Sequence, residues 1–333
     1  MTFKTNAELL KFRSKVTQAV RTFFEDRGYL EVDTPIALLA PPPEVHIDPI
    51  NVTVDSPRGE ETRYLQTSPE LPMKRLLCEG SGPIFQIAPV FRDSDESKRH
   101  RSEFRLLEWY NQPFPWETML VETEALLRHC AQQLRGEYSL QLGEETISIA
   151  DPFPRITVAD ACRDYLAIEI LAHLEVTALQ ALFEDRGWHF AQDDSWDELF
   201  HRLWVGHVEP KLNSDYPAYF LTDYPAPLAA LARRSSADPR VAERAECVIG
   251  GLELSNGFGE LHDPAEQRLR FEEDQQARAK LGKATPPLDE TFLGSVAKLE
   301  KAYGNALGLE RLMMLLSGAT DIQTVLPFPP SSI

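Results

Sequence analysis

The chain has 333 residues, and its content of 43% hydrophobic, 26% charged and 9% aromatic residues is typical of a soluble globular protein with a substantial core. Its formal charge of −18 argues against a broad nucleic-acid-binding surface, because binding to phosphates requires clustered lysine and arginine. The four dispersed cysteines indicate neither a zinc motif nor a disulfide framework. The lack of both an apolar run of ~20 residues and a signal-peptide core predicts a cytoplasmic protein that does not enter a membrane.

The first segment of the chain is expected to form a helix followed by strands. Apolar residues at helical spacing over residues 6–28 predict a helix that ends at Gly28. Pro35 and the prolines after it then require an extended loop. Residues 45–54 and 63–66 are expected to be two strands joined by a polar turn.

A second helix is predicted to begin near Ser68. Ser68 has the character of an N-cap, Pro69 that of a first helical residue and Glu70 that of a first-turn acid. On its own, Glu70 is better explained by stabilisation of the helix dipole than by ligand binding.

The stretch from Phe91 to Tyr110 contains the clearest site signal. Residues 84–91 and 103–110 show the alternation of strands, with a charged loop between them. Because side chains two apart share one face of a strand, a ring, a carboxylate and a phenol line up near Arg92 on the neighbouring strand. The residues on this face are Phe104, Leu106, Glu108 and Tyr110. They could hold an anion, a flat base and an ammonium group, although an amphipathic hairpin with a solvated basic tip explains the pattern equally well.

The middle of the chain carries less chemical information. Residues 116–134 predict a strong amphipathic helix, and residues 156–212 predict a mostly helical insertion with Trp188, Trp196 and Trp204 as packing residues. Residues 263–281 read as a charged, solvated surface helix.

A second candidate site lies in residues 246–260. Gly250 and Gly251 between two apolar arms predict a two-residue hairpin turn, which would place Val248 opposite Glu253. Glu246 would then be a diagonal neighbour on the same face, and two converging carboxylates suit Mg²⁺ carried by nucleotide phosphates. An exposed acidic hairpin is the simpler explanation of this segment by itself.

The third informative stretch is residues 306–318, a small-residue turn that leads into a very apolar helix. Arg311 falls in the first turn, where a cation opposes the helix dipole, and a bound phosphate would justify that position. A core helix whose arginine extends to solvent is the alternative.

Together, the three stretches resemble motifs 1, 2 and 3 of the class II aminoacyl-tRNA synthetases, with motif 1 ending at Pro35 in FFEDRGYLEVDTP. The segments TSPELPMKRLL, EFRLLEWY and GLELSNGFGEL are similar to the amino-acid pocket of the lysyl branch. The resemblance covers nearly the whole chain. It implies an α+β fold, a class II synthetase-like antiparallel sheet flanked by helices. It also implies a single catalytic domain over residues 1–333 with an insertion at about 156–212, and a homodimer formed through motif 1.

Motif 1 begins near residue 11, which leaves no room before it for the anticodon-reading domain of lysyl-tRNA synthetases. The chain therefore resembles the elongation factor P β-lysine ligases. This resemblance implies ATP-dependent activation of (R)-β-lysine, or lysine, and its transfer to a lysine of translation elongation factor P, with tRNA an unlikely partner. Two alternatives stay open: a truncated lysyl-tRNA synthetase-like enzyme that charges tRNA or another carrier, and a paralogue that binds lysine or adenylate without catalysis.

The resemblance also implies a nucleotide site. In it Arg92 binds the α-phosphate, Phe104 stacks on adenine, and Arg311 holds the γ-phosphate and the other face of the base. Glu246 and Glu253 hold Mg²⁺ between the phosphates. Further ATP contacts are implied for Asp93, Ser94, Arg101, Leu254 and Gly308.

For the amino acid, the resemblance implies a pocket with a carboxylate at each end. Glu70, supported by Ser68 and Pro69, takes the amine next to the reactive carboxylate. Glu260 and Tyr110 bind the distal ammonium. The remaining implied contacts are Asn256 at the carboxylate and Ala306 on the pocket floor. Lysyl-tRNA synthetases usually have glycine where Ala306 stands, whereas the β-lysine ligases have alanine. One methyl group changes binding by only ~1–3 kcal/mol, so Ala306 does not decide the isomer.

The loop of motif 2 departs from the family pattern. Ser94 stands where an acid usually contacts the adenine amine, with Asp95 as a candidate substitute, and Arg101 replaces an asparagine expected near ATP. ATP contacts are therefore expected to be rearranged or weakened. The basic residues 98–101 are explained as well by a solvated tip as by contact with an acidic acceptor protein.

Overall fold

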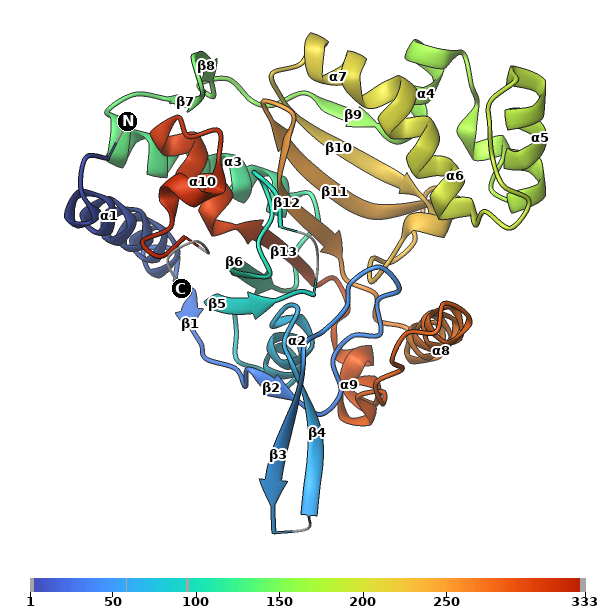
Figure 1. Cartoon of the computed structure of the whole chain (residues 1–333), viewed down its shortest axis with the longest axis horizontal. Coiled ribbons are helices and arrows are strands. Elements are labelled where there is room, and N and C mark those ends of the chain that lie inside the picture. The colour runs from blue at the N-terminus through green and yellow to red at the C-terminus, as the bar shows by residue number, and fades with distance from the viewer. Residues whose placement is uncertain (1–2, 58, 94–95, 330–333) are drawn as a thin grey trace. The chain divides into compact units, whose positions relative to one another are not determined.

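The computed structural model describes residues 3–57, 59–93 and 96–329. The chain forms two compact units, which are described separately (Figure 1). The first comprises Met1–Ala150 and Leu261–Ile333, and the second comprises Asp151–Glu260. The helices of the predicted insertion lie in the second unit, and a single domain over residues 1–333 stays a prediction.

The main sheet of the first unit contains the predicted hairpin. The strands lie side by side in the order β1 (Leu30–Glu31), β5 (Ile84–Phe91), β6 (Glu103–Asn111) and β13 (Tyr303–Gly308). β1 pairs parallel with β5, and the other two pairs are antiparallel. Tyr110 therefore faces Ile84, while Ala306 faces Glu108 across the other edge of β6.

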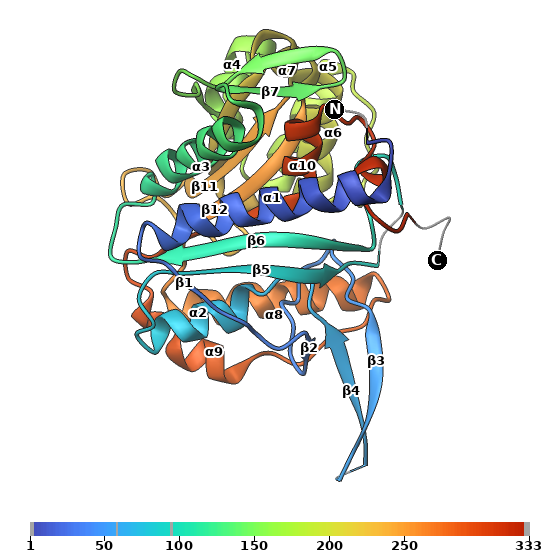
Figure 2. The same ribbon diagram turned by 90° about the vertical axis from the view of Figure 1, so that its left-hand side faces the viewer.

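Helices cover both faces of these strands, as the α+β expectation requires. α1 (Asn6–Glu25) and α3 (Thr118–Arg135) lie above β5 and β6 in Figure 2, and α2 (Glu70–Cys78), α8 (Pro264–Lys280) and α9 (Glu290–Ser295) lie below them. Thr5 caps α1 by accepting a hydrogen bond from the backbone N–H of Glu8. Phe24 on the apolar stripe of α1 packs between Phe85, with ring centroids 4.9 Å apart, and Trp109, 5.3 Å away.

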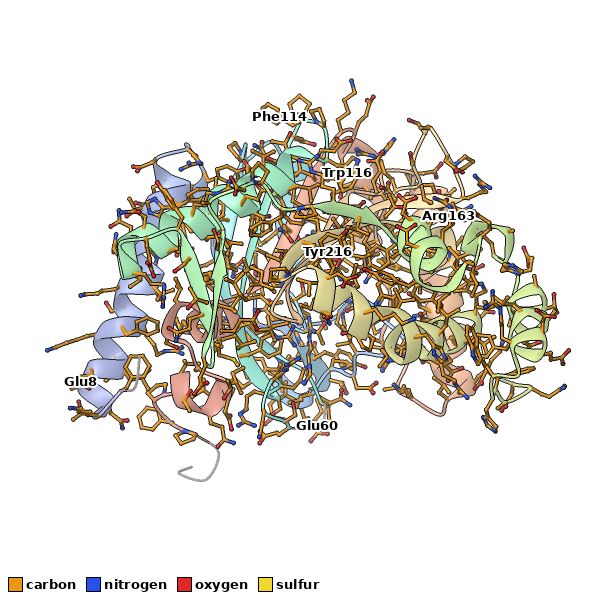
Figure 3. The ribbon with its side chains drawn as sticks, turned by 90° about the horizontal axis from the view of Figure 1, so that it is seen from above. Glu8, Glu60, Phe114, Trp116, Arg163 and Tyr216 are labelled. Carbon is orange, nitrogen blue, oxygen red and sulfur yellow. The ribbon has the colours of Figure 1, made fainter. Side chains whose placement is uncertain are left out.

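Smaller elements complete the first unit. Before α3, Phe114 is exposed whereas Trp116 is buried (Figure 3). After β13 the chain enters α10 (Leu309–Ser317), the apolar helix predicted from residues 306–318. The other strands and short 3₁₀ helices are β2 (Ala37–Leu38), β3 (Asn51–Ser56), β4 (Gly59–Leu65), β7 (Ser139–Leu142), β8 (Glu145–Ser148), η4 (Val296–Lys298) and η5 (Ile322–Val325).

The second unit has its own strands, in the order β12 (Leu252–Gly259), β11 (Val241–Ile249), β10 (Ala218–Pro225) and β9 (Arg155–Thr157). Gly250 and Gly251 join β11 to β12 with φ angles of 59° and 65°, which a two-residue turn with left-handed backbone requires. The predicted hairpin turn is therefore confirmed.

Helices of the second unit share one hydrophobic core with β10, and α4 packs directly against this strand. They are α4 (Val158–Leu166), α5 (Val176–Arg186), α6 (Trp196–Leu203) and α7 (Glu209–Asp215), with a π-helical turn η2 (Trp204–Val208) and the 3₁₀ turns η1 (Ile170–Ala172) and η3 (Ala226–Leu228). Trp196, Phe200 and Trp204 form a stacked series with ring centroids 5.2 and 5.6 Å apart. The predicted tryptophans, Trp188 included, belong to this hydrophobic core or pack against it, which confirms their role as packing residues.

The helix predicted over residues 263–281 is confirmed as α8, and most of its side chains are exposed or half-buried. The expectation that it is solvated throughout was wrong, because α8 buries Phe271, Gln267 and Arg278, and Arg278 is only 2% exposed. Its guanidinium donates hydrogen bonds to the carbonyl oxygens of Ala284, Glu44 and Ile47 and to Asp48. The extended loop after Pro35 is thereby tied to α8.

The same contacts explain why the strand expected over residues 45–54 begins later, at Asn51. Lys283 adds a hydrogen bond to the carbonyl of Val45, and Arg278 already takes the carbonyls of Glu44 and Ile47. Those carbonyl groups are occupied by cationic side chains and do not join a strand ladder.

No helix among the described residues has both the length and the apolar character needed to cross a membrane.

We predict that Arg278→Met lowers the free energy of unfolding by about 3 kcal/mol, because buried carbonyls and Asp48 lose their donor. Urea denaturation measures the change. Arg268→Met on the same helix is the control, since Arg268 forms an exposed ion pair with Glu290, and it should have little effect. Equal losses from both variants would contradict the structural role of Arg278.

Candidate active site

The centre of the candidate site in the first unit is Glu108, whose carboxylate is completely buried. Ser68 Oγ donates to its Oε1 at 2.6 Å, and Tyr110 Oη donates to its Oε2 at 2.7 Å. Burial, together with the charge of nearby Glu70, raises the pKa of Glu108 to about 7, even though the two hydrogen bonds and Arg92 favour the ionised form. A carboxylate in this state is well suited to receive an ammonium group.

Ser68 links Glu108 to the start of α2. The helix begins at Glu70 with Pro69 as N-cap, so the prediction of Ser68 as N-cap and Pro69 as first residue was one position early. Ser68 Oγ still accepts a hydrogen bond from the backbone N–H of Glu70 at 3.0 Å. Its hydroxyl therefore serves the helix start and the buried carboxylate together.

Glu70 is paired within its own helix. Its Oε1 accepts a hydrogen bond from the ammonium of Lys74, one turn further on, and Lys74 is 1% exposed. The same ammonium lies 6.0 Å from the centroid of the Tyr110 ring. These contacts define a cluster of two carboxylates, one ammonium and one phenol, hereafter the carboxylate cluster: Glu70, Lys74, Glu108 and Tyr110.

A second group of residues gathers at the open end of the β5–β6 hairpin. Arg92 lies 5.2 Å from the centroid of the Phe104 ring and donates from Nε to the carbonyl of Thr67 at 3.3 Å. Arg311 Nη2 is 3.0 Å from His100 Nε2. Burial and the guanidinium charges of Arg311, Arg99 and Arg92 lower the pKa of His100, so both predicted phosphate-binding arginines lie near one imidazole.

Buried contacts around Glu310 fix the helix that carries Arg311. Glu310 Oε1 accepts from Arg13 Nη2 at 2.9 Å, and its Oε2 accepts from the backbone N–H of Arg105 at 2.9 Å. These contacts join α1, β6 and α10. Gly308 matters here because a Cβ at that position would lie 3.3 Å from Cδ of Arg311, so the arginine side chain rests against the glycine.

The loop between β5 and β6 places one of its basic residues, Arg101, in a buried position. Its Nη1 donates to Glu96 at 3.2 Å and to the carbonyl of His100 at 3.3 Å. The backbone N–H of Asp93 donates to the carbonyl of Asp48 at 2.8 Å. The expectation of a fully solvated basic tip was therefore wrong for Arg101. Ser94 and Asp95 lie outside the described residues.

The predicted magnesium pair lies in the second unit. Val248 faces Glu253 as expected, but a bulge between Cys247 and Val248 shifts the register, so that Glu246 faces Asn256. Glu246 Oε1 accepts from Arg244 Nη2 at 2.7 Å and from Asn256 Nδ2 at 3.1 Å.

Burial raises the pKa of Tyr224, and the charges of both Glu246 and Glu253 raise it further, so the two carboxylates share one neighbourhood. Across the described residues, no three His, Cys, Asp or Glu side chains are grouped closely enough to hold a metal ion. Two carboxylates suit Mg²⁺ that also binds nucleotide phosphates, and this role stays a prediction.

The end of β12 carries the predicted distal carboxylate. Glu260 is completely buried, and its backbone forms an isolated antiparallel β-bridge with Ala232. Leu254, further back on β12, is also buried. Gly259 is required beside Glu260, because a Cβ there would lie 2.3 Å from Oε2 of Glu243, which forms an ion pair with Arg233. Asn256 Oδ1 is buried and accepts no hydrogen bond from the described residues.

Two residues of the site, Lys74 and His100, were absent from the predicted set. Glu108 was predicted as the carboxylate of the strand face that also carries Phe104 and Tyr110, but the family resemblance gave it no role of its own. Lys74 gave no such signal, because a lysine within an amphipathic helix ordinarily faces solvent. His100 lies in a loop, where spacing does not determine side-chain direction.

Comparison with known proteins supports one family. The model of the tRNA synthetases class II (D, K and N) matches residues 1–332. The elongation factor P–(R)-β-lysine ligase of Proteus mirabilis is 37% identical over 97% of this chain and 95% of the relative. The proteins of the same name from Pectobacterium atrosepticum and Pasteurella multocida are 38% and 37% identical, over 97% and 96% of this chain and 94% of each relative.

We predict that Glu108→Gln flattens the pH dependence of stability. The neutral Glu108 carboxyl contributes stability that is fully present below its ordinary pKa and is lost as the pH rises through about 7. From about pH 5 to about pH 8, the free energy of unfolding of the wild type should therefore fall by about 3 kcal/mol relative to the variant. Urea denaturation across this range, with the exposed Glu103→Gln on the same strand as control, measures the difference. Parallel pH profiles of wild type and Glu108→Gln would refute the assignment.

Proposed function

Because this chain belongs to the class II tRNA synthetase family of the D, K and N group, we propose that it activates (R)-β-lysine or lysine with ATP and transfers it to a lysine of translation elongation factor P. The observation that carries the proposal is the carboxylate cluster, an ammonium-binding arrangement formed by α2 and by β6, the strand that pairs with the one before Arg92. The relatives named elongation factor P–(R)-β-lysine ligase support the acceptor.

The first step forms the adenylate. A carboxylate oxygen of the amino acid attacks the α-phosphorus of ATP, and pyrophosphate leaves. The carboxylate is already a nucleophile, so the step needs positioning and charge neutralisation more than a strong base. Arg92 and Arg311 supply positive charge at the phosphates and Phe104 supplies a face for adenine. Glu246 and Glu253 would hold Mg²⁺, which neutralises phosphate charge when bound.

The second step forms an amide. The neutral amine of the acceptor lysine attacks the carbonyl carbon of the adenylate, AMP leaves, and the amine loses its proton. Both steps leave the amino acid's other amines unreacted, so these remain available for recognition.

Those amines are proposed to set the substrate class. Glu70 and Glu108, with the hydroxyl of Ser68, bind the amine near the reactive carboxylate. Glu260 and Tyr110 bind the distal ammonium. Asn256 supports the carboxylate. Ligands that lack the distal amine forgo an ion pair with the buried Glu260, and such polar mismatches discriminate strongly.

The assembly is proposed to be a cytoplasmic homodimer that does not require tRNA. β1 pairs with β5 along one edge only, Leu30 on β1 is 57% exposed, and Ile36 and Leu39 nearby are exposed as well. An edge strand with exposed apolar side chains is a natural surface for a second copy.

Pyrophosphate exchange with lysine, (R)-β-lysine and ornithine tests the proposal, followed by mass spectrometry of elongation factor P and an assay of tRNA charging. Exchange with a mass increase on elongation factor P is the expected result. Charged tRNA would instead support the lysyl-tRNA synthetase-like alternative, which motif 2 leaves open. Absence of exchange with every ligand would support a binding protein, an alternative that the arginine at position 101 favours.

We predict that Arg311→Ala reduces pyrophosphate exchange by about 10²-fold or more, because a charge at the phosphates is lost in the transition state. The oligomeric state, measured by light scattering, should not change. Arg105→Ala on β6 removes an exposed guanidinium and is the control. Exchange at the wild-type rate in Arg311→Ala would refute the role of Arg311.

We predict that Glu260→Gln weakens the preference for lysine over norleucine by about 10-fold or more in kcat/KM, since the buried charge opposite the distal amine is removed. Exchange assays with both ligands measure the ratio. Glu175→Gln removes an exposed carboxylate from the same unit and should leave the ratio as it is. A wild-type ratio in Glu260→Gln would exclude contact with the distal amine.

A further inference from the structure

A buried ammonium group lies inside the pocket that is proposed to bind ammonium groups. Lys74 is 1% exposed, and lysine is almost never buried to this extent unless it is paired. Its Nζ donates to Glu70 and lies 6.0 Å from the centroid of the Tyr110 ring. A solvated lysine one turn from Glu70 would stabilise the helix equally well, so the helix alone does not require Lys74 to be buried.

The groups placed near Lys74 come from its own helix and from β6, and η4 adds the charge of Lys298, which acts on Cys78. Glu70 lies one turn before Lys74 on α2, and Cys78, on which the charge of Lys74 also acts, lies one turn after it. Tyr110 faces Lys74 from β6 and donates a hydrogen bond to Glu108, on which the charges of Glu70 and Arg92 act. Lys74 therefore offsets the charge of Glu70, which itself raises the pKa of the buried Glu108.

We propose that Lys74 is a specificity-determining counter-ion of the amino-acid pocket, a role that rests on the proposed function. With Lys74, the two carboxylates and one ammonium of the cluster carry a single net negative charge when both acids are ionised. One ammonium of the ligand then completes the charge balance. Lys74 also fixes one oxygen of Glu70, which leaves the other oxygen for the ligand.

This arrangement favours a ligand amine over a proton. Without Lys74, the uncompensated charge of Glu70 would favour the protonated form of Glu108 further, and an incoming ammonium would have to displace that proton. Lys74 therefore makes the amine easier to bind near neutral pH. We expect the effect at the amino-acid pocket, because Lys74 lies against Glu70 and Tyr110, whereas Arg311 lies against His100.

The test is Lys74→Met, which keeps an unbranched side chain one atom shorter and removes its charge. KM for the amino acid should rise by about 10-fold to 100-fold, with KM for ATP unchanged. The pH profile of kcat/KM for the amino acid should move upward by about one unit, because more base is then needed to ionise both acids. Lys74→Arg, which keeps the charge, should restore the wild-type pH profile.

Two controls separate this role from simple packing. Thermal unfolding establishes that Lys74→Met folds, and the Glu70→Gln/Lys74→Met variant removes both partners of the ion pair, which should recover stability without recovering affinity. If Lys74→Met does not fold, the soluble Lys74→Arg and double variants still report the pH profile and KM. Recovery of wild-type KM by the double variant would overturn the proposal.

The proposed function and this inference fail in different ways. A wild-type protein that activates no amino acid refutes the function. A wild-type protein that is active, together with a Lys74→Met variant whose KM and pH profile match it, refutes the counter-ion role alone.

Discussion

The candidate site depends on a carboxylate that is completely removed from water. Glu108 keeps its place because hydroxyl groups from two segments of the chain, Ser68 before α2 and Tyr110 on β6, satisfy its oxygens. An ionised carboxylate in such surroundings is costly unless hydrogen bonds or cations compensate it. The fold provides the hydrogen bonds permanently and Lys74 provides a cation for the neighbouring Glu70. A ligand ammonium can supply the remainder.

The nucleotide-facing half follows a different principle, in which cations are concentrated rather than neutralised. Arg92, Arg311 and Arg99 all act on His100, and each repels the others in the absence of an anion. What holds Arg311 near Arg92 is the packing of α10, secured through Glu310 to α1 and to the backbone of β6. The buried contacts of Glu310 therefore offset the repulsion between these arginines.

Much of the architecture could be predicted from the sequence, because strand alternation and turn chemistry are local properties. The β5–β6 hairpin and the Gly250–Gly251 turn are determined by residues that lie near one another in the chain. Failures occurred where the deciding partner is distant in sequence. The burial of Arg278 depends on carbonyls more than two hundred residues away, and a bulge that no spacing rule reveals places Glu246 opposite Asn256. The ion pair of Lys74 with Glu70 is local, but its buried position also depends on β6, where the Tyr110 ring lies 6.0 Å from the ammonium, and this was not predictable from the helix alone.

The ion pair between Arg233 and Glu243 restricts how this protein can evolve. A side chain at position 259 would occupy the space of the Glu243 carboxylate, so a mutation there requires Glu243 and its ion pair with Arg233 to move. Positions 233, 243 and 259 should consequently change as a set among descendants of this sequence. Lineages that keep the glycine should also keep both charges.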